Sequence, residues 1–156
     1  MLSMKGFLNV MARPFEGKVA LVTGGNSGIG RSTAIKFAQE GAQVVIAARR
    51  VDEGMHTVES IRQAGGKAIF VRTDVAQAGE VAALMQKTVA TYGRLDCAFN
   101  NAGTGFAGPL HELTEEEWDR VIDINLKGVW LCMNIRSSRC SHKVAGSSSM
   151  TPQRPG

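Results

Sequence analysis

The sequence has little cysteine and no long apolar run. Its three cysteines include no Cys-x-x-Cys pair, which argues against both a disulfide framework and a zinc site. The three histidines lie far apart and lack metal-ligand spacing, so no metal site is predicted. No segment reaches the roughly 18 apolar residues of a membrane span, and residues 1–11 are too short and too broken for a secretory signal. We therefore expect a cytoplasmic protein that binds neither a metal nor a membrane.

Acidic residues are missing from the end of the chain. All 14 aspartates and glutamates precede residue 135, and the net charge of +4 comes from Arg136, Arg139, Lys143 and Arg154. This basic segment has no interleaved aromatic residues, so we expect no nucleic-acid binding. It also lacks the period of a helix or a strand, which predicts a disordered tail over residues 134–156. At the other end, residues 1–16 are predicted to form a flexible lead.

Between these ends, apolar strand patterns alternate with helical patterns. The expected strands cover residues 19–22, 43–47, 68–71 and 95–99. The expected helices cover residues 28–40, 52–64 and 80–92, and a fourth begins at a Thr114–Glu117 capping box and runs through Leu126. This alternation predicts an α/β domain over residues 17–133, with a doubly wound parallel sheet in the order 3-2-1-4. No pattern for a fifth strand follows, so the predicted sheet is truncated after the fourth strand and its helix.

A glycine-rich turn joins the first expected strand to the first expected helix. Such a turn brings backbone N–H groups and the positive end of a helix dipole against a pyrophosphate. Glycine is needed because a Cβ atom would block the turn or the approach of the phosphate. The residues assigned to this nucleotide-binding turn are Gly24, Asn26, Ser27, Gly28, Ile29 and Gly30. A plain tight turn is the alternative interpretation.

Over residues 15–133 the chain resembles the N-terminal part of the classical short-chain dehydrogenase/reductase family. Four motifs carry the resemblance, and they are Thr23-Gly24-x-x-x-Gly28-x-Gly30, Thr73-Asp74-Val75, Asn100-Asn101-Ala102-Gly103 and Asn125 in Ile124-Asn125-Leu126-Lys127-Gly128. The resemblance implies a Rossmann-type fold and hydride transfer between NADP(H) or NAD(H) and a small alcohol or ketone. It also implies oligomers for the full-length relatives.

The same resemblance assigns roles to the later motifs. Asp74, followed by Val75, is expected to accept a hydrogen bond from the adenine amino group, or else to be the N-cap of the next helix. The turn Asn101-Ala102-Gly103 is expected beside the nicotinamide-side ribose, although Asn100 and Asn101 could instead tie the turn to neighbouring backbone. Asn125 occupies the position that, in the family, helps to hold a water in a proton relay with a catalytic lysine.

The end of the second expected strand bears on the choice between NADP and NAD. An acidic residue there would bind the ribose 2′-hydroxyl of NAD, but this chain has Ala48 followed by Arg49 and Arg50. Arginine suits a 2′-phosphate because it carries a permanent charge and two fixed donors. The sequence therefore favours NADP, with two solvated loop cations as the alternative.

The catalytic Tyr-x-x-x-Lys pair of the family is absent from this sequence. Its single tyrosine, Tyr92, is followed four residues later by Asp96. In the family the tyrosine is the general acid/base and the lysine lowers its pKa, so the chain is predicted to be inactive. Two function classes stay open: an oxidoreductase by lineage, or a non-catalytic nucleotide-binding or partner-binding remnant of a frameshifted or truncated gene.

Overall fold

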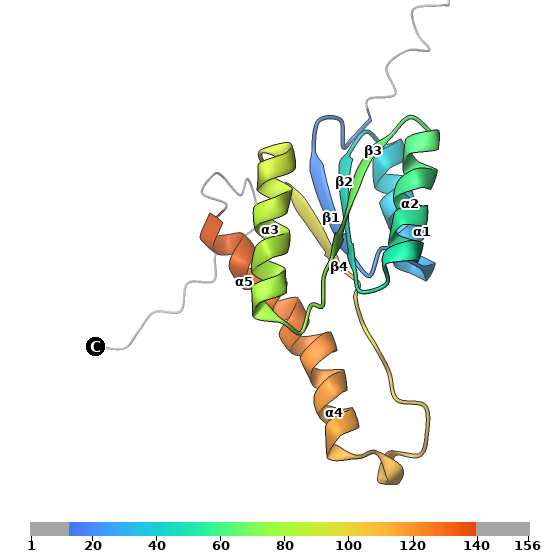
Figure 1. The fold of residues 1–156 in the computed structure, drawn as a ribbon, viewed down its shortest axis with the longest axis vertical. Helices are drawn as coiled ribbons and strands as arrows, with labels where there is room; N and C mark the ends of the chain where they lie inside the picture. The colour runs from blue at the N-terminus through green and yellow to red at the C-terminus, as the bar shows by residue number, and fades with distance from the viewer. Residues whose placement is uncertain (1–12, 140–156) are drawn as a thin grey trace, which may run out of the picture.

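The computed structural model describes residues 13–139, and the side chains of residues 13–134. Four parallel strands form one sheet with helices on both faces (Figure 1). The strands are β1 (Val19–Thr23), β2 (Gln43–Ala48), β3 (Lys67–Arg72) and β4 (Cys97–Asn100). The helices are α1 (Gly28–Gln39), α2 (Val51–Gln63), α3 (Ala78–Tyr92), α4 (Glu115–Ile122) and α5 (Gly128–Arg139). A short 3₁₀ turn, η2 (Leu110–Glu112), precedes α4, and a π-helical turn, η3 (Asp123–Lys127), joins α4 to α5.

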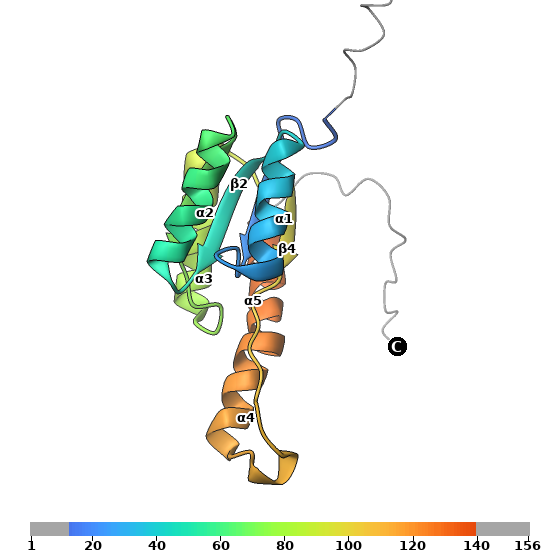
Figure 2. The ribbon, with the colours of Figure 1, turned by 90° about the vertical axis from the view of Figure 1, so that its right-hand side faces the viewer.

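The sheet has the order β3-β2-β1-β4, as the sequence predicted. Two apolar layers explain why β1 and β2 are almost wholly apolar. Leu21 and Val45 face α3 and α5, whereas Val22 and Ile46 face α1 and α2, the helices toward the viewer in Figure 2. Strands buried on both faces read as continuous apolar runs instead of alternating ones.

Local signals set the helix ends where the sequence predicted them. Gly41, just beyond α1, has a φ of 96°, and Gly93, which ends α3, has a φ of 77°. L-residues with a side chain rarely adopt this left-handed conformation. At the start of α4, the Glu117 N–H donates to the Thr114 hydroxyl at 3.2 Å, and the Thr114 N–H donates to the Glu117 carboxylate at 3.1 Å. These reciprocal bonds confirm the capping box.

Both ends of the folded region extend beyond the range predicted from the sequence. The Phe15 ring packs edge-on against Phe37, with 4.9 Å between centroids, and its N–H donates to the Glu40 carbonyl, so residues 13–16 belong to the folded region and not to a flexible lead. Helix α5 continues to Arg139, past the predicted start of the tail at residue 134. Propagating an existing helix requires much less favourable sequence than nucleating one. The rest of the predicted lead and tail lies outside the described residues.

The region after β4 projects away from the sheet. Figures 1 and 2 both show α4 beyond the end of the sheet, reached through the long segment that follows β4. Trp118 on α4 is 53% exposed and Trp130 on α5 is 54% exposed. Within residues 13–139, β4 pairs with β1 alone, so its other edge has no strand partner there. None of the helices between residues 13 and 139 is long and apolar enough to cross a membrane.

Candidate functional site

A cavity of about 340 Å³ lies where the four strands end. This volume falls in the range of small-molecule sites, roughly 300–1,000 Å³. Ten of the predicted nucleotide-binding residues line it, and they are Gly24, Asn26, Ser27, Arg49, Arg50, Asp74, Val75, Asn101, Ala102 and Gly103. The sequence analysis missed four further lining residues, Ala47, Ala48, Thr73 and Ile124. Two of them are the last residues of β2, and because open parallel sheets bind ligands at the carboxyl ends of their strands, that position is the signal that could have found them.

Close packing explains two of the three glycines in the Gly24-x-x-x-Gly28-x-Gly30 motif. A Cβ on Gly24, whose φ is 65°, would lie 3.0 Å from Ala102 Cα, and a Cβ on Gly30 would collide with the Gly24 carbonyl. Gly28 is different, because its φ is 52° and nothing lies within 4 Å of the position that a Cβ would take. Gly28, Ile29 and Gly30 lie outside the cavity lining, and the Ile29 side chain is 74% exposed. The turn therefore presents an open face beside Gly28.

The N-terminus of α1 has no side-chain cap. Its N-cap residue, Ser27, makes no side-chain capping bond, and the first turn of α1 carries no acidic residue. The Ser27 hydroxyl instead accepts from Arg50 Nη2 at 3.1 Å. The first N–H groups of a helix have no partner within the helix, and the helix dipole favours an anion there. This end of α1 can therefore receive a phosphate group.

The two arginines after β2 have different surroundings. Arg49 is exposed, lines the cavity, and forms no hydrogen bond or ion pair with the residues that the structure describes. Arg50 Nε lies 3.2 Å from a Glu53 carboxylate oxygen. When the Asn26 amide is assigned with its oxygen toward Arg50, as the surrounding donors favour, the oxygen can accept from Nη2 at 2.9 Å and from Nε at 3.1 Å. Arg50 thus joins the start of α2 to the glycine turn, while Arg49 faces the cavity without a partner.

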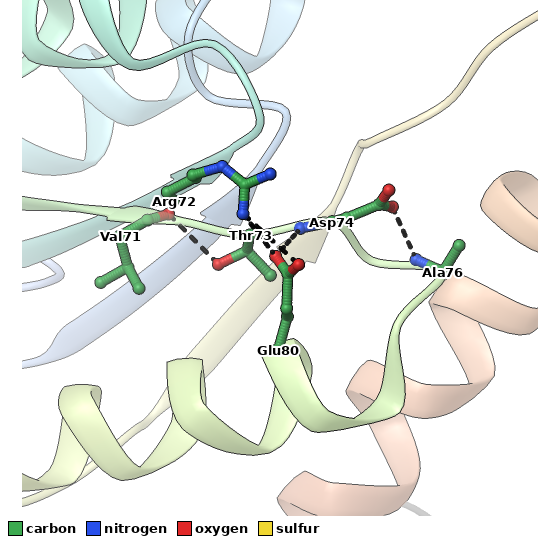
Figure 3. Close-up of polar contacts among 6 residues, drawn as sticks. All are labelled: Val71, Arg72, Thr73, Asp74, Ala76 and Glu80. Carbon is green, nitrogen blue, oxygen red and sulfur yellow. Dashed lines mark hydrogen bonds and ion pairs between the residues drawn. The ribbon is translucent and has the colours of Figure 1, made fainter.

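Asp74 lies in a hydrogen-bonded segment at the end of β3 (Figure 3). One of its carboxylate oxygens accepts from the Ala76 N–H at 3.0 Å, and the Asp74 N–H donates to Glu80 at 2.7 Å. Arg72 also pairs with Glu80, at 3.3 Å, which ties the start of α3 to β3. The N-cap of α3 is Gln77, so the alternative prediction that Asp74 caps this helix is wrong. The Asp74 carboxylate instead accepts from the N–H two residues further on, which is an Asx turn. This turn comes before the first turn of α3.

The turn after β4 is fastened to the glycine turn through Thr23. The Thr23 hydroxyl accepts from the N–H groups of Asn101 and Ala102, at 3.0 and 3.1 Å. The Asn101 amide donates to the carbonyls of Thr23 and Gly24, at 3.3 and 3.4 Å. The structural role considered for Asn101 is therefore present. Thr23 is a supporting residue that the sequence analysis did not assign, although a buried threonine at a strand end suits such bonding.

Asn125 lies in the π-helical turn and outside the cavity lining. Its side chain binds the backbone of Thr104, accepting from the N–H at 2.8 Å and donating to the carbonyl at 2.7 Å. Its neighbour Ile124 lines the cavity, and a Cβ on Gly103 would lie 3.3 Å from the Asn125 oxygen. Asn125 therefore holds the segment that follows Gly103 against the helix.

Tyr92 lies at the other end of the sheet. It is the last residue of α3, and β4 begins five residues later at Cys97, so Tyr92 is beside the strand starts while the cavity is at the strand ends. Desolvation raises the pKa of its hydroxyl, an effect that Arg62 partly opposes. A general acid/base requires the opposite shift. Among residues 13–139, no group of three histidine, cysteine or acidic side chains could hold a metal ion.

Comparisons with known proteins agree with this geometry. Residues 18–147 match the family model described as short chain dehydrogenase. An uncharacterized oxidoreductase of Listeria innocua is 44% identical over 114 residues, which cover 73% of this chain and 46% of that protein. Two solved structures cover 80% of this chain. One is a metagenomic short-chain oxidoreductase in complex with NADP, with a TM-score of 0.76, 38% identity and 57% of that chain covered. The other is a short chain dehydrogenase/reductase from Burkholderia phymatum in complex with NAD, with a TM-score of 0.77, 37% identity and 44% of that chain covered. The chain thus spans about half the length of the relatives that it matches.

Proposed function

The chain belongs to the short-chain dehydrogenase family, and on this premise we propose that residues 13–139 form an NADP(H)-binding unit. The reaction proposed for a longer form is hydride transfer between the nucleotide and an alcohol or carbonyl substrate. The described residues fit a dinucleotide in three respects. The N-terminus of α1 lacks a side-chain cap, Gly28 leaves an open face, and the cavity lies at the carboxyl ends of parallel strands, where such folds bind ligands.

Arg49 is the observation that carries the choice of NADP(H). It lines the cavity at the end of β2, and no described side chain neutralises it. A 2′-phosphate placed there would gain a charge-assisted hydrogen bond, whereas the 2′-hydroxyl of NAD would meet a cation and no carboxylate acceptor. NAD is the alternative cofactor, and Arg49 is then a solvated cation.

Each remaining residue has a proposed part in binding. The N–H groups at the start of α1, with Gly28 open beside them, would receive the pyrophosphate. The Asx turn engages one carboxylate oxygen of Asp74, so the other oxygen would accept from the adenine amino group. Val75 would pack against the base. Ala102 and Gly103 would lie along the nicotinamide-side ribose, held in place by Thr23 and Asn101. When bound, the nucleotide supplies the hydride that the family transfers.

We propose further that this 156-residue chain does not turn over an alcohol or a ketone. Its single tyrosine, Tyr92, has Asp96 in place of a lysine four residues on and lies at the end of the sheet opposite the cavity. General acid–base catalysis contributes typically 10²–10⁴-fold, and this contribution would be absent.

A nucleotide-binding or partner-binding remnant is the second candidate function, and the exposed Trp118 and Trp130 favour a partner. We also propose a cytosolic location, because the sequence has three cysteines and no Cys-x-x-Cys pair.

An equilibrium titration and a turnover assay test this proposal. The purified chain is titrated with NADPH and NADH while nicotinamide fluorescence is followed, and then incubated with NADP⁺ and a panel of secondary alcohols. We expect saturable NADPH binding and no absorbance change at the NADPH band above buffer. Saturable binding of neither nucleotide would reject the binding unit, and measurable turnover would reject the inactive assignment.

A further inference from the structure

The Arg50 guanidinium connects two elements that are far apart in sequence. Arg50 is the N-cap residue of α2, and the residues that it contacts, Asn26 and Ser27, lie in the turn before α1. Its Nη2 atom donates to the Ser27 hydroxyl at 3.1 Å, and Nη2 and Nε lie 2.9 and 3.1 Å from the assigned Asn26 amide oxygen. Nε also lies 3.2 Å from a Glu53 carboxylate oxygen. Two of its three nitrogens are therefore engaged by the protein itself.

The partners of Arg50 depend on it. Asn26 is only 7% exposed, so its amide oxygen would lose its bonds to Arg50 in a place that water reaches poorly. Ser27 directs its hydroxyl to Arg50 instead of capping α1. The conformation of the glycine turn around Asn26 and Ser27 is therefore tied to the position of α2.

Glu53 completes the arrangement from the first turn of α2. A carboxylate is favoured there by the helix dipole, so Glu53 is held near Arg50 independently of any ligand. Its negative charge offsets that of Arg50 beside the cavity. Arg49 has no such counterion among residues 13–139, which leaves it as the cation available to a phosphate.

We propose that Arg50, with Glu53 as its counterion, is a positioning residue that braces the glycine turn against α2. Arg50 then supports NADPH and NADH alike, and Arg49 alone distinguishes the 2′-phosphate. This inference rests on the proposed nucleotide-binding function, but the brace itself is a property of the nucleotide-free chain. A test without nucleotide therefore separates a failure of the brace from a failure of the proposed function.

Hydrogen exchange of the nucleotide-free chain is the first part of the test. The Gly24 N–H donates to the Ala47 carbonyl and the Arg31 N–H to the Ser27 carbonyl, so a peptide spanning residues 24–31 reports opening of the turn. Arg50→Ala is expected to accelerate hydrogen exchange in this peptide about fivefold or more. The turn loses its hydrogen bonds to Arg50, and a net loss of about 1 kcal/mol changes the opening equilibrium by a factor of that order. Arg49→Ala and the control Lys67→Ala, which removes a cation at the start of β3, are expected to change exchange by less than about twofold.

Nucleotide titration is the second part. Arg50→Ala is expected to weaken NADPH and NADH by the same factor, about 3- to 10-fold, and so to leave their ratio unchanged. Arg49→Ala is expected to weaken NADPH alone. The brace is rejected if the residue 24–31 peptide of Arg50→Ala exchanges as it does in the wild type. The proposal that Arg49 alone distinguishes the 2′-phosphate is rejected if Arg50→Ala lowers the preference for NADPH over NADH as Arg49→Ala does. If the wild type binds neither nucleotide, the proposed function fails while the exchange result still decides the brace.

Discussion

Both amide atoms of the Asn125 side chain bind the backbone of a single residue, Thr104. The oxygen accepts from the Thr104 N–H at 2.8 Å and the nitrogen donates to the Thr104 carbonyl at 2.7 Å. The amide thereby acts toward Thr104 as a neighbouring strand would, across 21 residues of sequence. Since Thr104 follows the turn that lines the cavity, the π-helical turn holds one wall of the proposed nucleotide site. A role for Asn125 in a proton relay stays a prediction.

Replacing Asn125 with Ala is expected to lower the free energy of unfolding by about 1 kcal/mol. Two hydrogen bonds are lost, but they are exposed to water, which compensates part of the loss. Urea denaturation measures the change. Lys127→Ala, which removes an exposed pairing with Asp123 on the same turn, is the control and should cost less than about 0.5 kcal/mol. Equal losses in the two variants would show that the Thr104 bonds contribute nothing.

Gly30→Ala is expected to cost about 2–3 kcal/mol of stability. The new methyl group would collide with the Gly24 carbonyl and lie 2.5 Å from the Asn101 amide nitrogen, so α1 would have to move. Gly79→Ala is the matched control, because nothing lies within 4 Å of its added Cβ and the site is in the first turn of α3. The control should raise stability by about 0.5–1 kcal/mol. Thermal melts that place both variants on the same side of the wild type would contradict the packing account.

Asp96 is expected to make stability depend on acid pH. Partial burial by itself raises its pKa, but the Val19 N–H, Arg94 and Lys18 more than offset this and hold the pKa below its ordinary value of 3.8. A depressed folded pKa stabilises the protein above pH 3.8, and this contribution is lost as the pH falls through the folded pKa. Asp96→Asn should therefore cost about 1–2 kcal/mol at pH 7 and flatten the decline below pH 4.

Unfolding titrations between pH 2 and pH 7 measure this effect. The exposed Asp119 on α4 provides the control, and Asp119→Asn should change stability at pH 7 by less than about 0.5 kcal/mol. A decline of unchanged steepness in Asp96→Asn would rule out this carboxylate as its source.

The isolated chain is expected to self-associate at micromolar concentration. Within residues 13–139 one edge of β4 has no strand partner, and Trp118 and Trp130 are each more than half exposed. Light scattering coupled to gel filtration measures the mass, and Trp118→Gln with Trp130→Gln should shift it toward that of a monomer. A monodisperse wild-type monomer with a reversible, cooperative melt would contradict the expectation.

Much of this fold could be predicted because its signals are local. Apolar runs placed the strands, Gly41 and Gly93 ended helices, and the Thr114–Glu117 capping box began one. The strand order then followed from general rules of handedness. The π-helical turn and the continuation of α5 to Arg139 could not be predicted in this way. The Asn125–Thr104 contact made in that turn joins residues that are distant in the sequence, and helix propagation needs no strong local signal.

The proposed site was predicted less completely. Its glycines and the Asn101 turn could be predicted, because sequence motifs identify the backbone conformations that these residues adopt. The difference between Arg49 and Arg50 does not, since two adjacent arginines look alike until Glu53, Asn26 and Ser27 are placed around one of them. For the same reason, the sequence could not show that Thr23 supports the neighbouring turn.

A thermodynamic cycle between the nucleotide and Arg49 tests the central claim most directly. Dissociation constants for NADPH and NADH are measured by calorimetry for the wild-type chain and for Arg49→Ala. The account predicts that the wild type binds NADPH more tightly by about 1–3 kcal/mol, the size of a charge-assisted contact, and that the variant binds both nucleotides equally. Tighter binding of NADH, unchanged by Arg49→Ala, would contradict it.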